Sequence, residues 1–181
     1  MPGSRPPLVL MGVSAAGKTV VGREAAALAG IPFLDADDLH PRANVEKMAR
    51  GIPLDDADRA PWLDAVGGEL RAAAPCIVAC SALTRAYRAR LRELAPGTIF
   101  ALLDVPRAVL EQRIAKREGH YMPPSLLDSQ LATLEAPGEG ERIVVLDGER
   151  TIAALAEQVA ALMADAPDAP QRPDVPGAPV G

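Results

Sequence analysis

"GVSAAGKT", residues 12–19, directly follows "PPLVLM", an apolar run of strand length at residues 6–11. The run does not alternate between apolar and polar residues, which is typical of a central parallel strand buried on both faces. After the stretch, residues 18–29 carry apolar side chains at helical spacing and end at Gly30, a residue that favours a helix C-terminus. The sequence therefore predicts a strand, a glycine-containing loop and a helix in succession.

The loop matches the pattern G-x-x-x-x-G-K-[ST] in the setting in which that pattern binds phosphate. Backbone N–H groups and the N-terminus of the following helix would face the phosphates of a nucleotide, with the Lys18 ammonium group beside them. The Thr19 hydroxyl group would bind Mg²⁺. A glycine-rich turn without function explains this combination less well. The predicted nucleotide-binding residues are Gly12, Val13, Ser14, Ala15, Ala16, Gly17, Lys18 and Thr19.

Strand and helix patterns alternate along the rest of the chain, which predicts an α/β fold with a mostly parallel sheet. Further strands are expected at residues 31–37, 76–80, 98–105 and 142–148. Further helices are expected at residues 40–51, 55–74, 84–94, 106–118, 125–135 and 151–164. In the first of these helices, Val45, Met48 and Ala49 form an apolar face that we expect to pack on the core. Residues 1–164 make one domain, and the proline- and alanine-rich residues 165–181 form a tail expected to be disordered.

The 181 residues carry a formal net charge of −5, which gives no general attraction to nucleic acid or to an anionic membrane. No apolar run approaches the roughly 20 residues that span a bilayer, and the N-terminal segment lacks a secretory h-region. We therefore expect a cytoplasmic protein without a nucleic-acid or membrane partner. Cys76 and Cys80 lie on one face of a predicted strand, about 13 Å apart along it, which is too far for a disulfide. Both are predicted to be buried, reduced thiols.

A cluster of polar residues follows the second predicted strand. Asp35 and Asp37 share one face of an extended segment at the carboxyl edge of the sheet, where open α/β folds bind ligands. We assign Mg²⁺ binding through water to Asp35, and acceptance of the proton from an attacking hydroxyl group to Asp37. His40, Asn44 and Lys47 follow at i, i+4 and i+7, a polar stripe suited to hydrogen bonds with a polyol. The alternatives are a solvated acidic loop and an exposed helix face.

Four stretches resemble a known family: "GVSAAGKT", "DADDLHPRANVEKMARGIPLDDADRAPWL", "CSALTRAYRARLR" and "GHYMPPSLLDSQLATLE". Together they closely resemble the bacterial-type gluconate kinases, small P-loop enzymes similar in fold to shikimate kinases. The resemblance implies a three-layer P-loop kinase fold with a five-stranded parallel sheet, helices on both faces and a mobile lid at about residues 117–135. It also implies phosphorylation of the primary hydroxyl group of D-gluconate, with ATP and Mg²⁺ as cofactors and D-gluconate as the small-molecule partner. Members of the family suggest a homodimer.

The resemblance also implies roles for single residues. The positions that match the family's substrate contacts are Asp37, His40, Lys47, Ser81, Arg88 and His120. The positions that match catalytic groups are Lys18, Asp35, Asp37 and Arg117, and Arg113 matches a nucleotide contact. Gluconate is an anion, and Arg88 in the basic helix at 84–94 can pair with its carboxylate. The other arginines of that helix are expected to be mostly solvated.

The chain departs from the family pattern in its phosphate-binding loop. Ala15 and Ala16 stand where the family commonly has glycine and serine, and Ala15 restricts a backbone that glycine leaves free. Two other functions stay open: a kinase of the same fold for shikimate or another sugar acid, and a nucleotide-binding regulator without catalysis. The common GTPases are disfavoured, because the sequence has no N-K-x-D motif.

Overall fold

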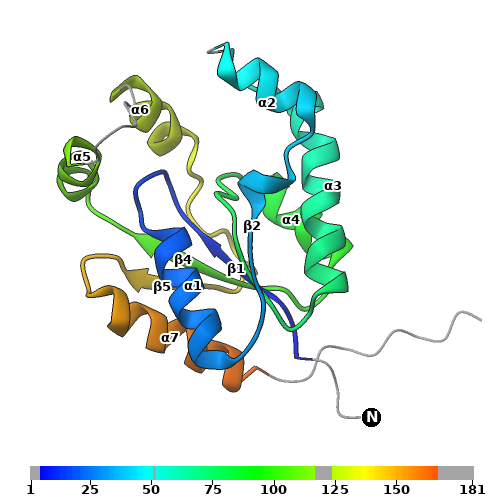
Figure 1. Ribbon diagram of the computed structural model, residues 1–181, viewed down its shortest axis with the longest axis vertical. Helices are drawn as coiled ribbons and strands as arrows, with labels where there is room; N and C mark the ends of the chain where they lie inside the picture. Colours follow the sequence, from blue (N-terminus) through cyan, green and yellow to red (C-terminus); the bar gives the residue numbers. More distant parts are fainter. Residues whose placement is uncertain (1–4, 51, 117–123, 167–181) are drawn as a thin grey trace, which may run out of the picture.

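The strand that precedes the phosphate-binding loop lies at the centre of a five-stranded parallel sheet with the order β2-β3-β1-β4-β5 (Figure 1). The strands are β1 (Leu8–Met11), β2 (Phe33–Asp35), β3 (Ile77–Ala79), β4 (Ile99–Asp104) and β5 (Ile143–Asp147). Because all strands are parallel, their carboxyl ends meet at one edge of the sheet. The loop at 12–19 leaves from the middle of that edge.

The computed structural model describes residues 5–50, 52–116 and 124–166. Its helices are α1 (Lys18–Ala29), α2 (Arg42–Ala49), α3 (Asp56–Ala72), α4 (Arg85–Leu94), α5 (Arg107–Ala115), α6 (Pro124–Thr133) and α7 (Ile152–Ala164), with a short 3-10 helix at Ala36–Leu39. None of the helices in this part of the chain is long and apolar enough to cross a bilayer. The alternation predicted from the sequence is confirmed, and the observed elements are mostly a few residues shorter than expected.

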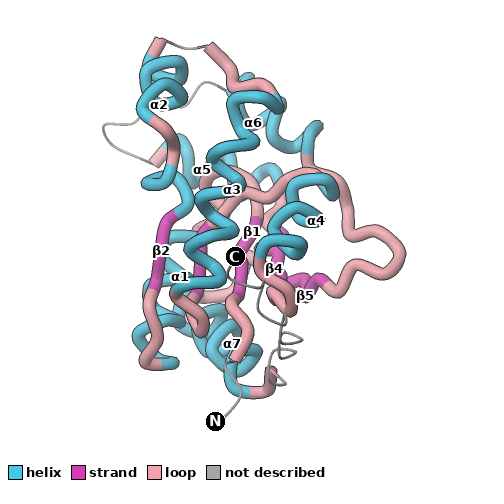
Figure 2. Tube along the Cα trace, turned by 90° about the vertical axis from the view of Figure 1, so that its right-hand side faces the viewer, coloured by secondary structure: helices cyan, strands magenta, loops and turns pink. Residues whose placement is uncertain are grey.

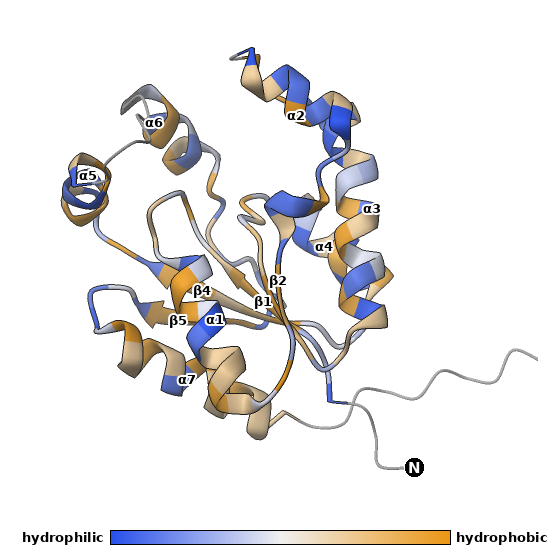
Figure 3. Cartoon of the chain, in the orientation of Figure 1, coloured by the Kyte–Doolittle hydropathy of each residue, from blue (hydrophilic) through white to orange (hydrophobic). Residues whose placement is uncertain are grey.

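Helices cover both faces of the sheet because its central strand is apolar on both sides. Leu8 and Leu10 belong to a core cluster that includes residues of α1 and α7, whereas Val9 and Met11 belong to a second cluster with residues of α3 and α4. All four side chains are fully buried. The hydrophobic colours of Figure 3 accordingly concentrate in the strands. The predicted three-layer architecture is confirmed.

The expected apolar face of α2 does not pack on the core. Val45 is 49% exposed and Met48 is 43% exposed, whereas Asn44, assigned to the polar face, is 4% exposed. The prediction failed because α2 lies beyond the carboxyl ends of the strands, at the same end of the molecule as α6 (Figures 1 and 2). There its inner face meets α3 through polar contacts: the Asn44 side-chain amide donates to the Asp58 carbonyl at 2.7 Å.

Several other expectations are settled by the described residues. Cys76 and Cys80 are free and buried, as predicted, and burial raises the pKa of the Cys80 thiol to about 12. Gly30 caps α1 in the left-handed conformation, with φ of 66°. The first part of the expected lid, residues 117–123, and most of the expected tail, residues 167–181, lie outside the described residues.

A buried ion pair ties α4 to the segment before β5. The Arg88 side chain is 0% exposed and donates from Nε and Nη2 to the two carboxylate oxygens of Glu141, both at 2.8 Å. Its Nη1 donates to the carbonyl groups of Ala82 and Leu83. The Arg88 bonds to Glu141, together with hydrogen bonds from the Gly138 N–H group and from Arg92, lower the pKa of Glu141 to about 2.

Alanine substitutions at two adjacent glycines of α3 are expected to change the stability of the fold in opposite directions. A Cβ atom at Gly67 would lie 2.5 Å from the Cβ atom of Leu94 on α4, whereas one at Gly68 would meet nothing within 4 Å. We expect Gly67→Ala to lower the free energy of unfolding by about 1–3 kcal/mol through overpacking. Gly68→Ala should raise it by up to about 1 kcal/mol, because alanine favours the helix. Urea unfolding of both variants measures the difference, and a Gly67→Ala variant at least as stable as the native chain would contradict the packing.

Replacing Glu141 should destabilise the fold in a pH-dependent way. Glu141→Gln leaves the Arg88 charge buried without its partner, and we expect a loss of about 3 kcal/mol at pH 7. The pKa of Glu141 is lowered in the folded state, so the native pair stabilises above the ordinary glutamate pKa and loses this effect as the pH falls toward 2. The difference in the free energy of unfolding between the native protein and the variant should therefore become smaller below about pH 4.5. Denaturant unfolding across this range tests it, with exposed Glu139→Gln as the control; a gap independent of pH would contradict the assignment.

Candidate active site

The loop at 12–19 forms a concave backbone turn at the start of α1. Gly12, Ala15 and Gly17 all have positive φ angles, of 145°, 66° and 99°. No side chain caps the N-terminus of α1, and its first turn holds no acidic residue. No side chain therefore caps its N–H groups, and no acidic residue of its own first turn offsets its partial positive charge, which suits this helix N-terminus to binding an anion. Lys18 begins the helix and donates from Nζ to the Val13 carbonyl at 3.0 Å.

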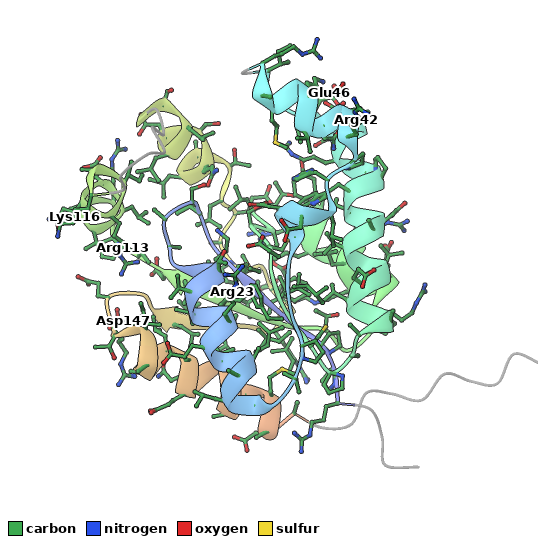
Figure 4. All side chains as sticks on the ribbon, viewed as in Figure 1. Arg23, Arg42, Glu46, Arg113, Lys116 and Asp147 are labelled. Atoms are coloured by element: carbon green, nitrogen blue, oxygen red, sulfur yellow. The ribbon has the colours of Figure 1, made fainter. Side chains whose placement is uncertain are left out.

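The alanine that replaces the family's glycine adopts the left-handed conformation. For a residue with a Cβ atom this conformation costs about 1–2 kcal/mol. Arg113 on α5 donates from Nη1 to the carbonyl groups of Ala15 and Ala16, at 3.4 and 3.1 Å, and from Nη2 to that of Gly148 at 2.8 Å. Figure 4 shows the Arg113 side chain extending from α5 toward the body of the molecule. Arg113 therefore supports the loop from its carbonyl side, and its contact with a nucleotide stays a prediction.

The predicted Mg²⁺ ligands lie side by side. The Thr19 hydroxyl group donates to Oδ2 of Asp35 at 2.9 Å, across the gap between α1 and β2. Within the described ranges, no group of three or more His, Cys, Asp or Glu residues could form a closed metal cage. One hydroxyl and one carboxylate suit Mg²⁺, which retains waters and phosphate oxygens and needs few protein ligands. The residues present therefore fit the metal that the loop implies.

The prediction that Asp35 and Asp37 share one face of an extended segment is wrong, because β2 ends at Asp35. The segment is not extended there: Asp37 belongs to the 3-10 helix, and its N–H group donates to Oδ1 of Asp35 at 3.1 Å. The residue is exposed as a whole, but atoms crowd its carboxyl group. This burial, and then the negative charge of Asp35, raise the pKa of Asp37, against the lowering effects of Lys18 and His40. A raised pKa makes this carboxylate a better proton acceptor.

His40 stacks on Trp62 of α3, with ring centroids 4.5 Å apart and planes inclined by 7°. Trp62 is buried and donates from Nε1 to the Ala36 carbonyl at 2.7 Å. The Nδ1 atom of His40 is buried without a hydrogen-bond partner among the described residues. Burial lowers the pKa of His40, which favours the neutral ring. A neutral imidazole can accept a hydrogen bond from one hydroxyl group and donate one to another.

Arg59 and Tyr87 extend this side of the site, and neither is among the residues predicted from the sequence. Arg59 donates from Nη1 to the Tyr87 hydroxyl group at 3.0 Å, and that hydroxyl donates to Oδ1 of Asp56 at 2.6 Å. Arg59 also lies near enough to His40 for its charge to lower the His40 pKa. Arg59 belongs to the "DRAPWL" part of the family-like stretch at residues 35–63, three positions before Trp62. That position is the sequence signal that could have identified it.

Of the other predicted substrate contacts in the described residues, two are paired with carboxylates of the protein and one lies beside the loop. Lys47 on α2 is paired with Asp58, and its Nζ also lies 3.7 Å from Asp55. Arg88 is buried against Glu141 instead of facing a cleft. Ser81 lies beside the loop, where its carbonyl accepts from the Gly12 N–H group at 3.4 Å.

Two further predicted residues, Arg117 and His120, lie outside the described residues. Their assignments to catalysis and substrate binding stay predictions. The described part of the site therefore runs from the loop and Lys18, through Asp35 and Asp37, to His40 and Arg59.

Known proteins resemble this chain over most of its length. A family profile described as an AAA domain matches residues 8–137. The gluconokinase of Gluconobacter oxydans is 48% identical over 147 residues, covering 79% of this chain and 83% of that protein. The thermosensitive gluconokinase of Escherichia coli is 43% identical over 155 residues, covering 83% of each chain.

Solved structures show the same relationship. A gluconokinase from Sinorhizobium meliloti superimposes with a TM-score of 0.80 at 45% identity, covering 90% of this chain and 93% of that one. A shikimate kinase from Acinetobacter baumannii superimposes with a TM-score of 0.57 at 21% identity, covering 88% and 93%, and so shares the fold. The resemblance noted in the sequence is thereby confirmed. This chain belongs to the gluconokinase family of P-loop kinases.

Proposed function

We propose that this protein transfers the γ-phosphoryl group of ATP to the primary hydroxyl group of D-gluconate, forming 6-phospho-D-gluconate. The observation that carries the proposal is the position of Asp37 between the two halves of the site. Its carboxyl group lies close enough to Lys18 of the loop and to His40 of the acceptor side for each of them, when protonated, to lower its pKa. A proton acceptor placed between a phosphate-binding loop and a polyol-binding surface is what phosphoryl transfer to a hydroxyl group requires.

The reaction depends mainly on positioning and charge, because phosphoryl transfer passes through a loose transition state. The N–H groups of the loop and the N-terminus of α1 hold the phosphates, and Lys18 neutralises charge that builds on them. Thr19 and Asp35 would hold Mg²⁺, which supplies electrostatic stabilisation of the phosphate oxygens. Asp37 orients the acceptor hydroxyl group and takes its proton as the new P–O bond forms.

The acceptor carboxylate needs a cation, and Arg59 is better placed than Arg88. The guanidinium group of Arg88 is fully buried and occupied by Glu141 and two carbonyl groups. Arg59 is partly exposed, and its described side-chain hydrogen bond uses Nη1 alone. A guanidinium group carries five N–H donors, so Arg59 retains donors that can form a bidentate pair with a carboxylate. Tyr87 holds it in place.

Coupled ADP release with Mg·ATP tests the acceptor. We expect turnover with gluconate and little with shikimate, glucose or AMP, each measured against a no-acceptor control. An Arg59→Met variant should raise the gluconate KM by at least about tenfold, since a charge-assisted pair stabilises by roughly 1.5–3 kcal/mol. ATP binding without acceptor-dependent ADP release would point instead to a regulator, and turnover with shikimate alone would reassign the acceptor.

Replacing the proposed proton acceptor should slow the transfer step. Asp37→Asn keeps the shape of the side chain but not its basicity, so we expect kcat to fall by about 10²–10⁴ while ATP still binds. The matched control is Asp38→Asn, an exposed neighbour on the same short helix. Single-turnover kinetics isolate the chemical step, and circular dichroism checks folding. Native kcat in a folded Asp37→Asn variant would remove Asp37 from this role.

A further inference from the structure

Gln130 of α6 makes two direct hydrogen bonds to the phosphate-binding loop. The Ser14 N–H group donates to Oε1 of Gln130 at 2.7 Å, and Nε2 of Gln130 donates to the Ser14 hydroxyl group at 2.9 Å. Both bonds are partly buried and join residues 116 positions apart in the chain. One carboxamide therefore bonds both the N–H and the hydroxyl group of Ser14.

Gln130 is a polar residue on a face of α6 that is otherwise apolar. Leu127 is 2% exposed and belongs to the core cluster that contains residues of the loop, and Leu131 and Leu134 pack against that cluster. Positions 127, 130, 131 and 134 share one face of a helix, because they are three or four residues apart. A carboxamide on such a face costs free energy unless it is hydrogen-bonded. The contact with Ser14 satisfies that requirement.

The bonds from Gln130 complement those from Arg113. Arg113 on α5 fixes the carbonyl groups of Ala15 and Ala16, and Gln130 on α6 fixes the N–H and hydroxyl groups of the preceding residue, Ser14. Three consecutive loop residues, the second of them in the left-handed conformation, are thus held by side chains from two helices. This support opposes rotation of the peptide groups whose N–H vectors form the cradle.

We propose that Gln130 is a positioning residue, which orients Ser14 so that the loop is preorganised to bind the phosphates of ATP. A neutral carboxamide suits this role, since it accepts from the N–H group and donates to the hydroxyl group without placing negative charge near phosphate. Glutamate at this position would add such a charge. The inference rests on the proposed function, because it takes residues 12–19 to hold a nucleotide.

Direct measurement of ATP binding by calorimetry tests this role without an acceptor. Gln130→Met has similar length and flexibility but no hydrogen bond, and we expect its ATP Kd to rise about tenfold, because binding must then also order the loop. The gluconate KM should stay within about twofold, because Gln130 bonds to the loop and not to the acceptor side. The control is Gln112→Met, which removes the same carboxamide from an exposed position on α5. Thermal melting separates loss of folding from loss of affinity.

A double-mutant cycle adds a readout that a purely structural role would not produce. Ser14→Ala removes the hydroxyl contact and keeps the N–H contact, so its effect on ATP affinity should be smaller in the Gln130→Met background than in the native chain. A folded Gln130→Met variant with unchanged ATP affinity would overturn the proposal. Tighter binding would overturn it as well, since it would mean that Gln130 competes with phosphate for the Ser14 N–H group. If the native protein binds ATP but does not phosphorylate gluconate, the assignment of gluconate as acceptor is wrong, and the role of Gln130 is not affected.

Discussion

The burial of β1 on both faces is the constraint on which the rest of the structure depends. Leu8, Val9, Leu10 and Met11 have no exposed surface, and each face of the strand belongs to a different helical layer. The chain leaves this buried strand at the carboxyl edge of the sheet. Gly12 makes that exit: a Cβ atom there would lie 3.1 Å from the Leu103 carbonyl oxygen, and its φ of 145° disfavours other residues. The phosphate-binding loop thus stands at the centre of the sheet edge, with β2 and the acceptor side next to it across β3.

The sequence was informative wherever a residue's environment follows from local pattern. Strand periodicity placed Cys76 and Cys80 in the core, and the loop motif located Lys18 and Thr19, because each depends on neighbours a few positions away. It failed for α2, since helical periodicity identifies an apolar face but not whether the body of the protein lies beside it. It also could not anticipate the partner of Arg88, because Glu141 lies 53 positions later in the chain.

Long-range polar contacts account for most of what the motifs left out of the candidate site. Arg59 bonds to Tyr87 and Gln130 bonds to Ser14, over 28 and 116 positions. Hydrophobic periodicity cannot predict such polar pairs, because a polar residue on a helix surface usually faces solvent. Both residues lay inside stretches that resembled the family, so their presence was visible and their role was not. The role requires the three-dimensional placement of α3, α4 and α6 around the sheet edge.

The attachment of α2 bears on how this scaffold can change over evolutionary time. The helix carries part of the acceptor-side motif, yet its inner face contacts α3 through Asn44 and Lys47 and contributes no residue to the two core clusters in the described part of the chain. Substitutions on it therefore leave the packing around β1 intact. Such substitutions can change the surface beyond the carboxyl ends of the strands without repacking the layers that hold the phosphate-binding loop. Because polar contacts with α3 hold α2 in place, this helix can diverge in sequence faster than the strands and helices that surround β1.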